Sequence, residues 1–173
     1  TSSWQIRLKG KTLKALMGSD SPYFGDHVEL SDEKSDFAST VGVGGIVGTK
    51  FTYPTDRLEH KDHLLTSEKE IIWKKWLNIY NDNLLSTGDY RGDLYDIGYD
   101  KPETHAIQKG DTLFYAFYSP EWNGEVELRG LEGNDYKIID YVNDKFISDV
   151  QGKSPKIKVE FSRYLLIKAV PGK

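Results

Sequence analysis

The chain has 173 residues and a formal net charge of −4, from 23 Lys and Arg against 27 Asp and Glu. Typical domains have about 100–150 residues, so this length allows one domain or two small ones. The small charge, with no run of five or more like charges, argues against a nucleic-acid-binding surface. No stretch of about 18 apolar residues is present, so we expect no membrane-spanning helix. The absence of cysteine excludes a disulfide framework, a thiol nucleophile and a cysteine-based zinc site.

The amino-terminal part has the rhythm of alternating helices and short strands. The chain starts with Thr1 and no charged-then-apolar leader follows, so we expect a processed chain or a piece of a longer one. A first helix is predicted from Ser3 towards Leu16, with Gly10 as an interruption. Three shorter elements follow: a strand at 23–28, a helix at 32–41 and a glycine-rich approach to a strand at 42–51. This order is typical of βα units with parallel strands.

The clearest element is a helix from Ser67 to about Ser86. Ser67 and Glu70 have the spacing of a capping box, in which hydroxyl and carboxylate satisfy the first free amides. Thr87-Gly88 predicts the end of the helix, with Gly88 in a left-handed C-cap. Apolar residues recur at helical spacing: Ile72, Trp73, Trp76, Leu77, Tyr80 and Leu84. So wide an apolar face needs a large partner surface.

After about residue 89, most of the sequence alternates with a period of two residues. The segment 113–118 is apolar on both faces, which indicates a strand covered on both sides. Alternation and turn residues such as Asn123-Gly124 predict short strands in an antiparallel β-sandwich. The residues expected in its core are Leu113, Tyr115, Phe117, Val126, Leu128, Ile157, Val159, Phe161 and Leu165.

Several motifs that suggest chemistry favour a plainer interpretation. The glycine cluster 42–48 matches neither the dinucleotide-binding pattern nor the P-loop, so close backbone packing is favoured. His60 and His63 have a possible metal-ligand spacing, but they lie in a polar loop with no further ligand nearby, and we expect no metal site. His105 is expected to be a strand-edge residue. The sequence contains no Gly-x-Ser-x-Gly nucleophile elbow.

Two features leave a binding role open. Asp26 and His27 follow a glycine after an aromatic strand, and strand ends carry the chemistry in βα architectures. A loop or cap role for them is about as well supported as a binding role. Trp122 could stack on a sugar ring, or it could cover its own sheet at a hairpin tip.

Several stretches of the chain match one known family in their order. They are 2–9, 25–30, 44–52, 80–81 with 84–90, and 128–131 with Tyr136. The most specific are the helix that ends in Leu-Leu-Ser-Thr-Gly-Asp-Tyr and the strand that ends in Leu-Arg-Gly-Leu. Together these stretches resemble the carboxy-terminal part of α-galactosidase-like glycoside hydrolases, nearest to family 36 and its clan D relatives, and the resemblance runs nearly end to end.

The resemblance implies a fold of mixed class, α/β plus all-β. Residues 1–90 would be the last part of a (β/α)8 barrel, with 23–28 as strand seven and 46–51 as strand eight. Residues 91–173 would be a carboxy-terminal antiparallel β-sandwich domain. The implied partners are the remainder of the catalytic barrel and an α-galactoside or related oligosaccharide. A homo-oligomer is also allowed, and no cofactor is expected.

The family cleaves terminal α-galactosides with retention, through one Asp nucleophile and one Asp acid/base. In the family these residues end strands four and six, so both would lie upstream of Thr1 and no catalytic residue is assigned. Asp26 and His27 match a strand-seven end that lines the sugar pocket, and Trp4 and Arg7 are weaker candidates for the same pocket. The alternative is a non-catalytic carbohydrate-binding or structural β-domain with a helical amino-terminal extension.

Overall fold

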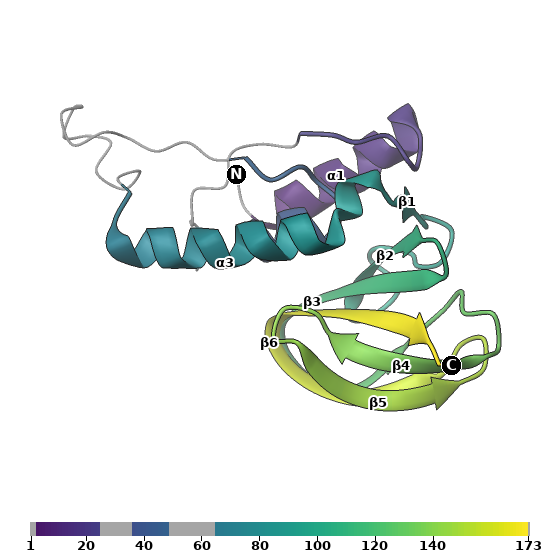
Figure 1. Ribbon diagram of the computed structural model, residues 1–173. Helices are drawn as coiled ribbons and strands as arrows, with labels where there is room; N and C mark the ends of the chain where they lie inside the picture. The colour runs from purple at the N-terminus through teal and green to yellow at the C-terminus, as the bar shows by residue number, and fades with distance from the viewer. Residues whose placement is uncertain (1–2, 25–35, 49–64, 173) are drawn as a thin grey trace.

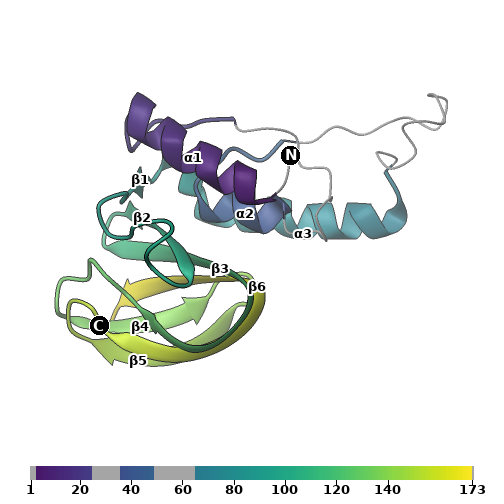
Figure 2. The same ribbon diagram turned by 180° about the vertical axis from the view of Figure 1, so that it is seen from behind.

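The computed structural model describes residues 3–24, 36–48 and 65–172. A layer of helices lies on one face of an antiparallel β-sheet (Figures 1 and 2). The helices are α1 (Ser3–Met17), α2 (Asp36–Gly42), α3 (Ser67–Asn83) and the 3-10 helix η3 (Leu85–Thr87). The strands are β1 (Asp89–Tyr90), β2 (Glu103–Lys109), β3 (Thr112–Glu127), β4 (Asp135–Asp140), β5 (Lys145–Gln151) and β6 (Lys156–Pro171).

The strands form one six-stranded sheet in the order β1-β2-β3-β6-β4-β5. Each neighbouring pair is antiparallel. The long strands β3 and β6 pair along nearly their full length and curve together (Figure 1). The antiparallel β-domain that the alternating pattern predicted is therefore confirmed, and its strands belong to a single sheet.

A β-bulge in β3 changes which of its residues face the inner core. The register against β6 shifts between Ser119 and Glu121, around Pro120, which has no amide hydrogen to donate to the ladder. Before the bulge, odd-numbered residues such as Phe117 face the inner core, whereas Val126 faces it after the bulge. Asn123-Gly124 lies within β3, so the turn predicted there is wrong: the strand bends at the bulge and continues.

The inner core lies within the curve of the sheet, on the face of β3 that carries Leu113, Tyr115 and Phe117. Eight of the nine residues predicted for the core are buried there, and the ninth, Leu165, is partly buried against them. The face assignment made from the alternation is therefore confirmed. The inner core also receives Tyr95, Tyr136, Ile138, Ile167 and Ala169.

The outer core lies between the opposite face of the sheet and the helices. Ala116 and Tyr118 of β3 meet Phe37 of α2 and Trp76 of α3 in this core. Trp76 stacks on Phe37, with 6.0 Å between ring centroids, and meets the edge of Tyr164 at 5.7 Å. The segment 113–118 is thus covered on both sides, as its sequence predicted.

Helix α3 begins and ends with different caps from those predicted. Its N-cap is Thr66, whose hydroxyl accepts a hydrogen bond from the Lys69 amide. Leu84, with φ of 45°, takes the left-handed position, and its amide donates to the Tyr80 carbonyl. Gly88 has an extended backbone with φ of −82°, so its predicted left-handed cap role is wrong. Its small size still matters, because a Cβ there would lie 2.4 Å from Ile107.

Gly10 does not interrupt α1, which runs continuously from Ser3 to Met17. A Cβ on Gly10 would lie 2.2 Å from the Tyr23 hydroxyl, so glycine permits the close approach of the two segments. Tyr23 and Gly45 form a parallel β-bridge, in which the Ile46 amide donates to the Tyr23 carbonyl at 2.9 Å. Beyond this bridge, Phe24 and residues 46–48 form no strand, although strands were predicted at 23–28 and 46–51. Residues 25–28 and 49–51, and the loop with His60 and His63, lie outside the described residues.

Replacing Val159 by Asp should lower the free energy of unfolding by several kcal/mol, because it places an unpaired charge in the inner core. Lys158→Asp is the matched control, since this neighbouring side chain is exposed on the other face of β6. Urea unfolding of both variants measures the difference. Equal stability of the two variants would show that the faces of β6 are assigned wrongly.

Candidate functional site

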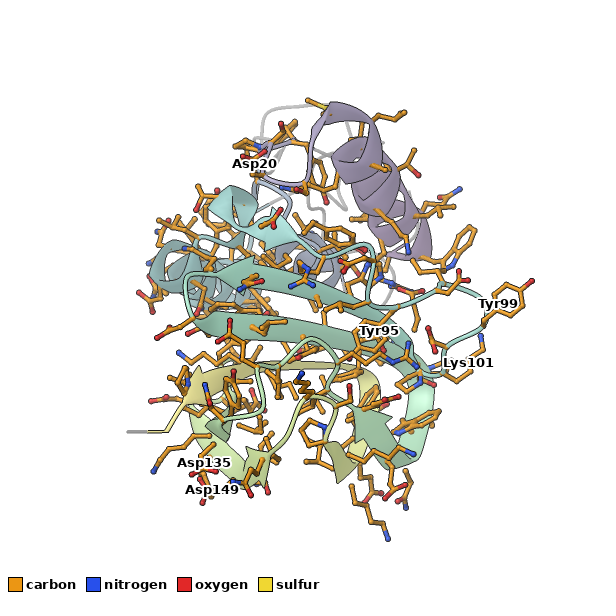
Figure 3. The ribbon with its side chains drawn as sticks, turned by 90° about the vertical axis from the view of Figure 1, so that its right-hand side faces the viewer. Asp20, Tyr95, Tyr99, Lys101, Asp135 and Asp149 are labelled. Atoms are coloured by element: carbon orange, nitrogen blue, oxygen red, sulfur yellow. The ribbon has the colours of Figure 1, made fainter. Side chains whose placement is uncertain are left out.

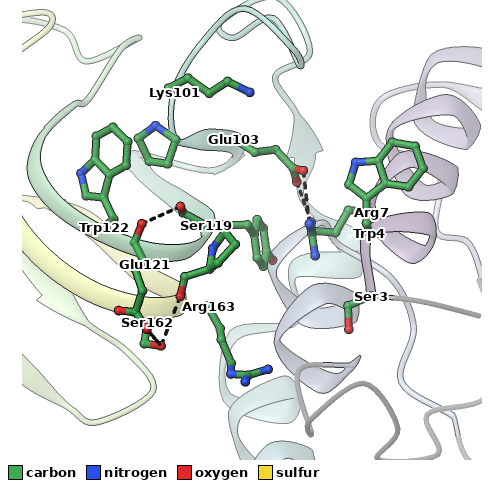
Figure 4. A pocket seen from close by; sticks show the side chains of 13 residues that line it. Ser3, Trp4, Arg7, Lys101, Glu103, Ser119, Glu121, Trp122, Ser162 and Arg163 are labelled. Carbon is green, nitrogen blue, oxygen red and sulfur yellow. Dashed lines mark hydrogen bonds and ion pairs between the residues drawn. The ribbon is translucent and has the colours of Figure 1, made fainter.

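An open groove of about 780 Å³ lies at the junction of the helical layer and the sheet (Figure 4). One wall is the first turn of α1, and the other is formed by the start of β2 and the bulged region of β3 with its partner β6. The groove is lined by Ser3, Trp4, Arg7, Lys101, Pro102, Glu103, Tyr118, Ser119, Pro120, Glu121, Trp122, Ser162 and Arg163.

Two indole rings stand on opposite sides of the groove, Trp4 on α1 and Trp122 on β3 (Figure 4). Trp4 is 52% exposed, which is unusual for so large an apolar side chain. Trp122 is partly buried against the inner core, and among the described residues its indole N–H has no hydrogen-bond partner. It lies just after the bulge, so the hairpin-tip position is wrong, but the ring covers its own sheet as one interpretation expected. The ring also lines the groove, and stacking on a sugar stays a prediction.

Arg7 lines the groove and forms a largely buried ion pair with Glu103. Its Nε donates to one carboxylate oxygen at 2.6 Å and its Nη2 to the other at 3.3 Å. Its Nη1 donates to the Ser39 hydroxyl at 3.0 Å, and the guanidinium lies over the ring of Tyr118, 4.3 Å from its centre. These contacts join α1 to α2, β2 and β3, and they occupy most of the donors of Arg7.

The ion pair continues into a buried chain of hydrogen bonds. The Glu103 carboxylate accepts from His105 Nε2 at 2.8 Å, and His105 Nδ1 lies 2.7 Å from the Tyr90 hydroxyl. A neutral imidazole with its proton on Nε2 satisfies both contacts, because Tyr90 then donates to Nδ1. His105 lies on β2 and is only 1% exposed, so the residue predicted at a strand edge is buried. It pairs with Ala116 of β3, and the β1 pairing of β2 is at residues 107 and 108.

The protonation states follow from burial and from these partners. Burial lowers the pKa of His105 and outweighs the hydrogen bond from its Nε2 to Glu103, so the imidazole stays neutral in the fold. Burial alone would raise the pKa of Glu103, but hydrogen bonds from His105 and Arg7 outweigh it and lower this pKa. Glu103 is therefore a carboxylate that holds the two walls together.

Of the four binding residues proposed from the sequence, the structure describes two. Trp4 and Arg7 share the groove, while Asp26 and His27 lie outside the described residues. Glu103 was not singled out in the sequence, because a lone Glu at a strand start carries no signal of a partner 96 residues away. Lys101 reaches the groove from the loop before β2. Trp122 reaches it just after the bulge in β3, and the alternation of the sequence does not reveal where that bulge lies.

A second, smaller hollow of about 360 Å³ lies at Asp135, Lys137 and Asp149, well away from Lys101 (Figure 3). Lys137 and Asp149 are direct neighbours across β4 and β5, so these charges offset one another as in an ordinary sheet surface. Within residues 3–24, 36–48 and 65–172, no three potential ligands gather to hold a metal ion. In the same segments, no helix is long and apolar enough to cross a membrane.

No protein-family profile matches the chain. A Flavonifractor plautii protein named A type blood alpha-D-galactosamine galactosaminidase is 35% identical over 178 residues. The match covers 98% of this chain but 15% of that protein, so the chain spans a small part of its relative's length.

Two solved structures match 98% of the chain with a TM-score of 0.55 and 11% identity. They are α-galactosidase I from Mortierella vinacea, of which 44% is covered, and an Anoxybacillus α-amylase, of which 47% is covered. At this identity the likeness concerns the fold alone, and it does not distinguish a galactosidase from an amylase. The resemblance to α-galactosidase-like glycoside hydrolases is confirmed by the sequence match to the galactosaminidase.

Glu103→Gln should lower the free energy of unfolding by about 3 kcal/mol, because it leaves the largely buried Arg7 without its counter-charge. Asp93→Asn is the matched control: it also removes a carboxylate from an arginine, but Asp93 is exposed and its ion pair with Arg91 contributes about 1 kcal/mol or less. Chemical unfolding of both variants gives the comparison. If Glu103→Gln lost as little stability as the control, the Arg7–Glu103 ion pair would not hold α1 and β2 together.

Stability should decrease as the pH falls below about 6.5, the pKa of an unfolded histidine. Below that pH the unfolded chain binds a proton at residue 105 that the folded chain does not bind, so protonation favours unfolding. Between pH 7.5 and 5.5 this effect is about 1 kcal/mol. Urea unfolding at both pH values should show a smaller change in His105→Gln than in the original chain. An identical pH dependence would mean that His105 is protonated in the fold.

Proposed function

We propose that this chain, which resembles the α-galactosidase-like glycoside hydrolases over nearly its whole length, is the carboxy-terminal part of a retaining glycosidase that cleaves terminal α-galactosides. The observation that carries the proposal is the 35% identity to a galactosaminidase across 98% of the chain. The family origin is therefore that of a glycoside hydrolase. What we propose beyond this origin is the bond that is cleaved, a terminal α-galactoside, and the retention of configuration.

In this proposal residues 1–90 are the last portion of a (β/α)8 barrel and 91–173 are the β-domain. The parallel bridge between Tyr23 and Gly45 supports it, because barrel strands are parallel. The order of segments supports it too: α1, the bridge residue Tyr23, α2, the bridge residue Gly45, and α3 alternate as in βα units.

The remainder of the barrel is the proposed partner of the helical layer. Leu8, Leu16 and Ile71 are exposed on α1 and α3, although each would gain roughly 1.5–3 kcal/mol by full burial. All three side chains lie on helices of the same layer. Exposed apolar side chains that lie together mark a surface to which another protein segment binds. Other segments of the parent enzyme would supply that cover.

The two catalytic carboxylates would come from strands outside this chain, about 5–5.5 Å apart as retention requires. One would attack the anomeric carbon and the other would protonate the leaving oxygen, then activate water. We propose that Asp26 and His27 line the sugar pocket of the assembled enzyme. Trp4 can offer its exposed ring to a sugar, whereas Arg7 would position the wall, since Glu103 and Ser39 already engage it.

The second candidate is a non-catalytic carbohydrate-binding or structural β-domain with a helical extension. The groove with two indole rings favours this candidate, because binding there needs no catalytic carboxylate. The coding sequence upstream of Thr1 separates the two: a βα rhythm with two Asp-bearing strand ends supports the enzyme, and an unrelated linker supports the binding module.

The full-length parent should hydrolyse a chromogenic α-galactoside, while the purified 173-residue chain should show no turnover. Hydrolysis with NMR detection of the first-formed sugar should show the α-anomer, the product of retention. Turnover by the isolated chain, free of parent enzyme, would contradict the placement of both carboxylates elsewhere. A parent that cleaves no α-galactoside or α-galactosaminide would overturn the proposed substrate.

A further inference from the structure

We propose that the groove between Trp4 and Trp122 is itself a binding site for a short oligosaccharide. The inference rests on the side chains of the groove and does not depend on whether the parent hydrolyses α-galactosides. Its volume of about 780 Å³ lies within the usual range of ligand sites, about 300–1,000 Å³. The groove is open to solvent, and Trp4 and Trp122 stand on its opposite sides (Figure 4).

The walls of the groove are held in fixed positions before any ligand binds. The Arg7–Glu103 ion pair joins the α1 wall to the β2 wall, and both side chains are only 12–13% exposed. The loop before β2 is fixed by Arg129, which donates to both oxygens of the Asp100 carboxylate at 2.9 and 3.0 Å. This contact holds the adjacent Lys101 at the groove rim. A site that is already ordered loses little entropy on binding.

The chemistry of the lining fits sugar hydroxyls, which both donate and accept hydrogen bonds. Lys101 and Arg163 are cationic donors at the rim. Glu121 is an acceptor, and its carboxylate already receives a hydrogen bond from the Ser162 hydroxyl at 2.9 Å. The groove therefore offers both donors and acceptors, the kinds of polar group that fix the orientation of a ligand.

The two indole rings supply the apolar contact that a sugar needs for its C–H faces. Trp4 is half exposed on one wall, and Trp122 lies on the other with its rear packed on the inner core. Large aromatic side chains provide much contact area at little entropic cost. The mixed charge of the rim, with Lys101 and Arg163 against Glu121, does not provide the dense positive surface that a nucleic acid requires.

The test follows the four tryptophan indole N–H signals of the 173-residue chain in ¹H–¹⁵N NMR spectra during titration with raffinose, a neutral trisaccharide with a terminal α-galactosyl unit. Trp4 and Trp122 should shift saturably, while Trp73 and Trp76, which pack in the outer core, should not. Maltotriose as a second probe shows whether the groove prefers galactosyl units. Failure of the parent to hydrolyse galactosides would leave these results unaffected.

Trp4→Ala should weaken binding roughly tenfold, equivalent to about 1.4 kcal/mol for the loss of one aromatic contact. Phe146→Ala is the matched control, because Phe146 is 53% exposed, like Trp4, but lies on β5 away from the groove. Trp122→Leu removes the second ring while it keeps an apolar contact with the inner core. The spectra without ligand verify that each variant is folded.

Saturable shifts confined to the groove, lost in Trp4→Ala and retained in Phe146→Ala, would support the proposal. Three results would overturn it: no shift with either sugar, shifts of the same size in all four indoles, or equal affinity in Trp4→Ala and the original chain. The last of these would assign the exposed ring of Trp4 to a protein contact in the parent.

Discussion

The largely buried ion pair between Arg7 and Glu103 is the contact on which the arrangement of this structure depends. It joins residues 96 positions apart, on the first helix and on the second strand. Burying either charge alone would be strongly unfavourable, so each residue fixes the position of the other. The pair also recruits Ser39 of α2 and, through His105, Tyr90 of β1. Four elements therefore meet at one network.

The network places the helices over a part of the sheet that is apolar on both faces. The middle of β3 packs with its own curved sheet on one side and with the helices on the other. Either face left open would expose large aromatic side chains to water. The helical layer and the sheet thus need each other, and the groove with Trp4 and Trp122 forms where their edges meet.

The sequence predicted features that depend on local periodicity. The helix at 67–86, the two-sided segment 113–118 and the core residues of the β-domain were all identified from spacing, because each pattern reports one covered face. The caps of α3 were assigned wrongly, since Ser67 and Thr66 are both competent caps and Leu84 adopts a conformation that propensity disfavours. The sequence did not predict that β3 is continuous. Its pairing with β6 shifts register at the bulge around Pro120 and then continues through Asn123-Gly124, which had the composition of a turn.

The candidate site was less predictable, because it depends on residues that are distant in sequence. Trp4 and Arg7 were proposed through a family resemblance and Trp122 as one of two interpretations, and the structure brings the three into one groove. Glu103 and His105 became informative only once their partners were located, since a carboxylate or imidazole in a strand has no periodic signature. The roles of Asp26 and His27 rest on the resemblance.

Hydrogen exchange tests most directly the claim that the helices and the sheet share one core. All residues of α2 are buried, between the outer face of the sheet and the other helices. In a series of rising sub-denaturing urea concentrations, the amides of α2 should therefore lose protection together with those of β2 and β3, with similar opening free energies. Loss of protection in α2 at urea concentrations that leave β2 and β3 intact would show that the helical layer unfolds on its own, and would contradict the shared core.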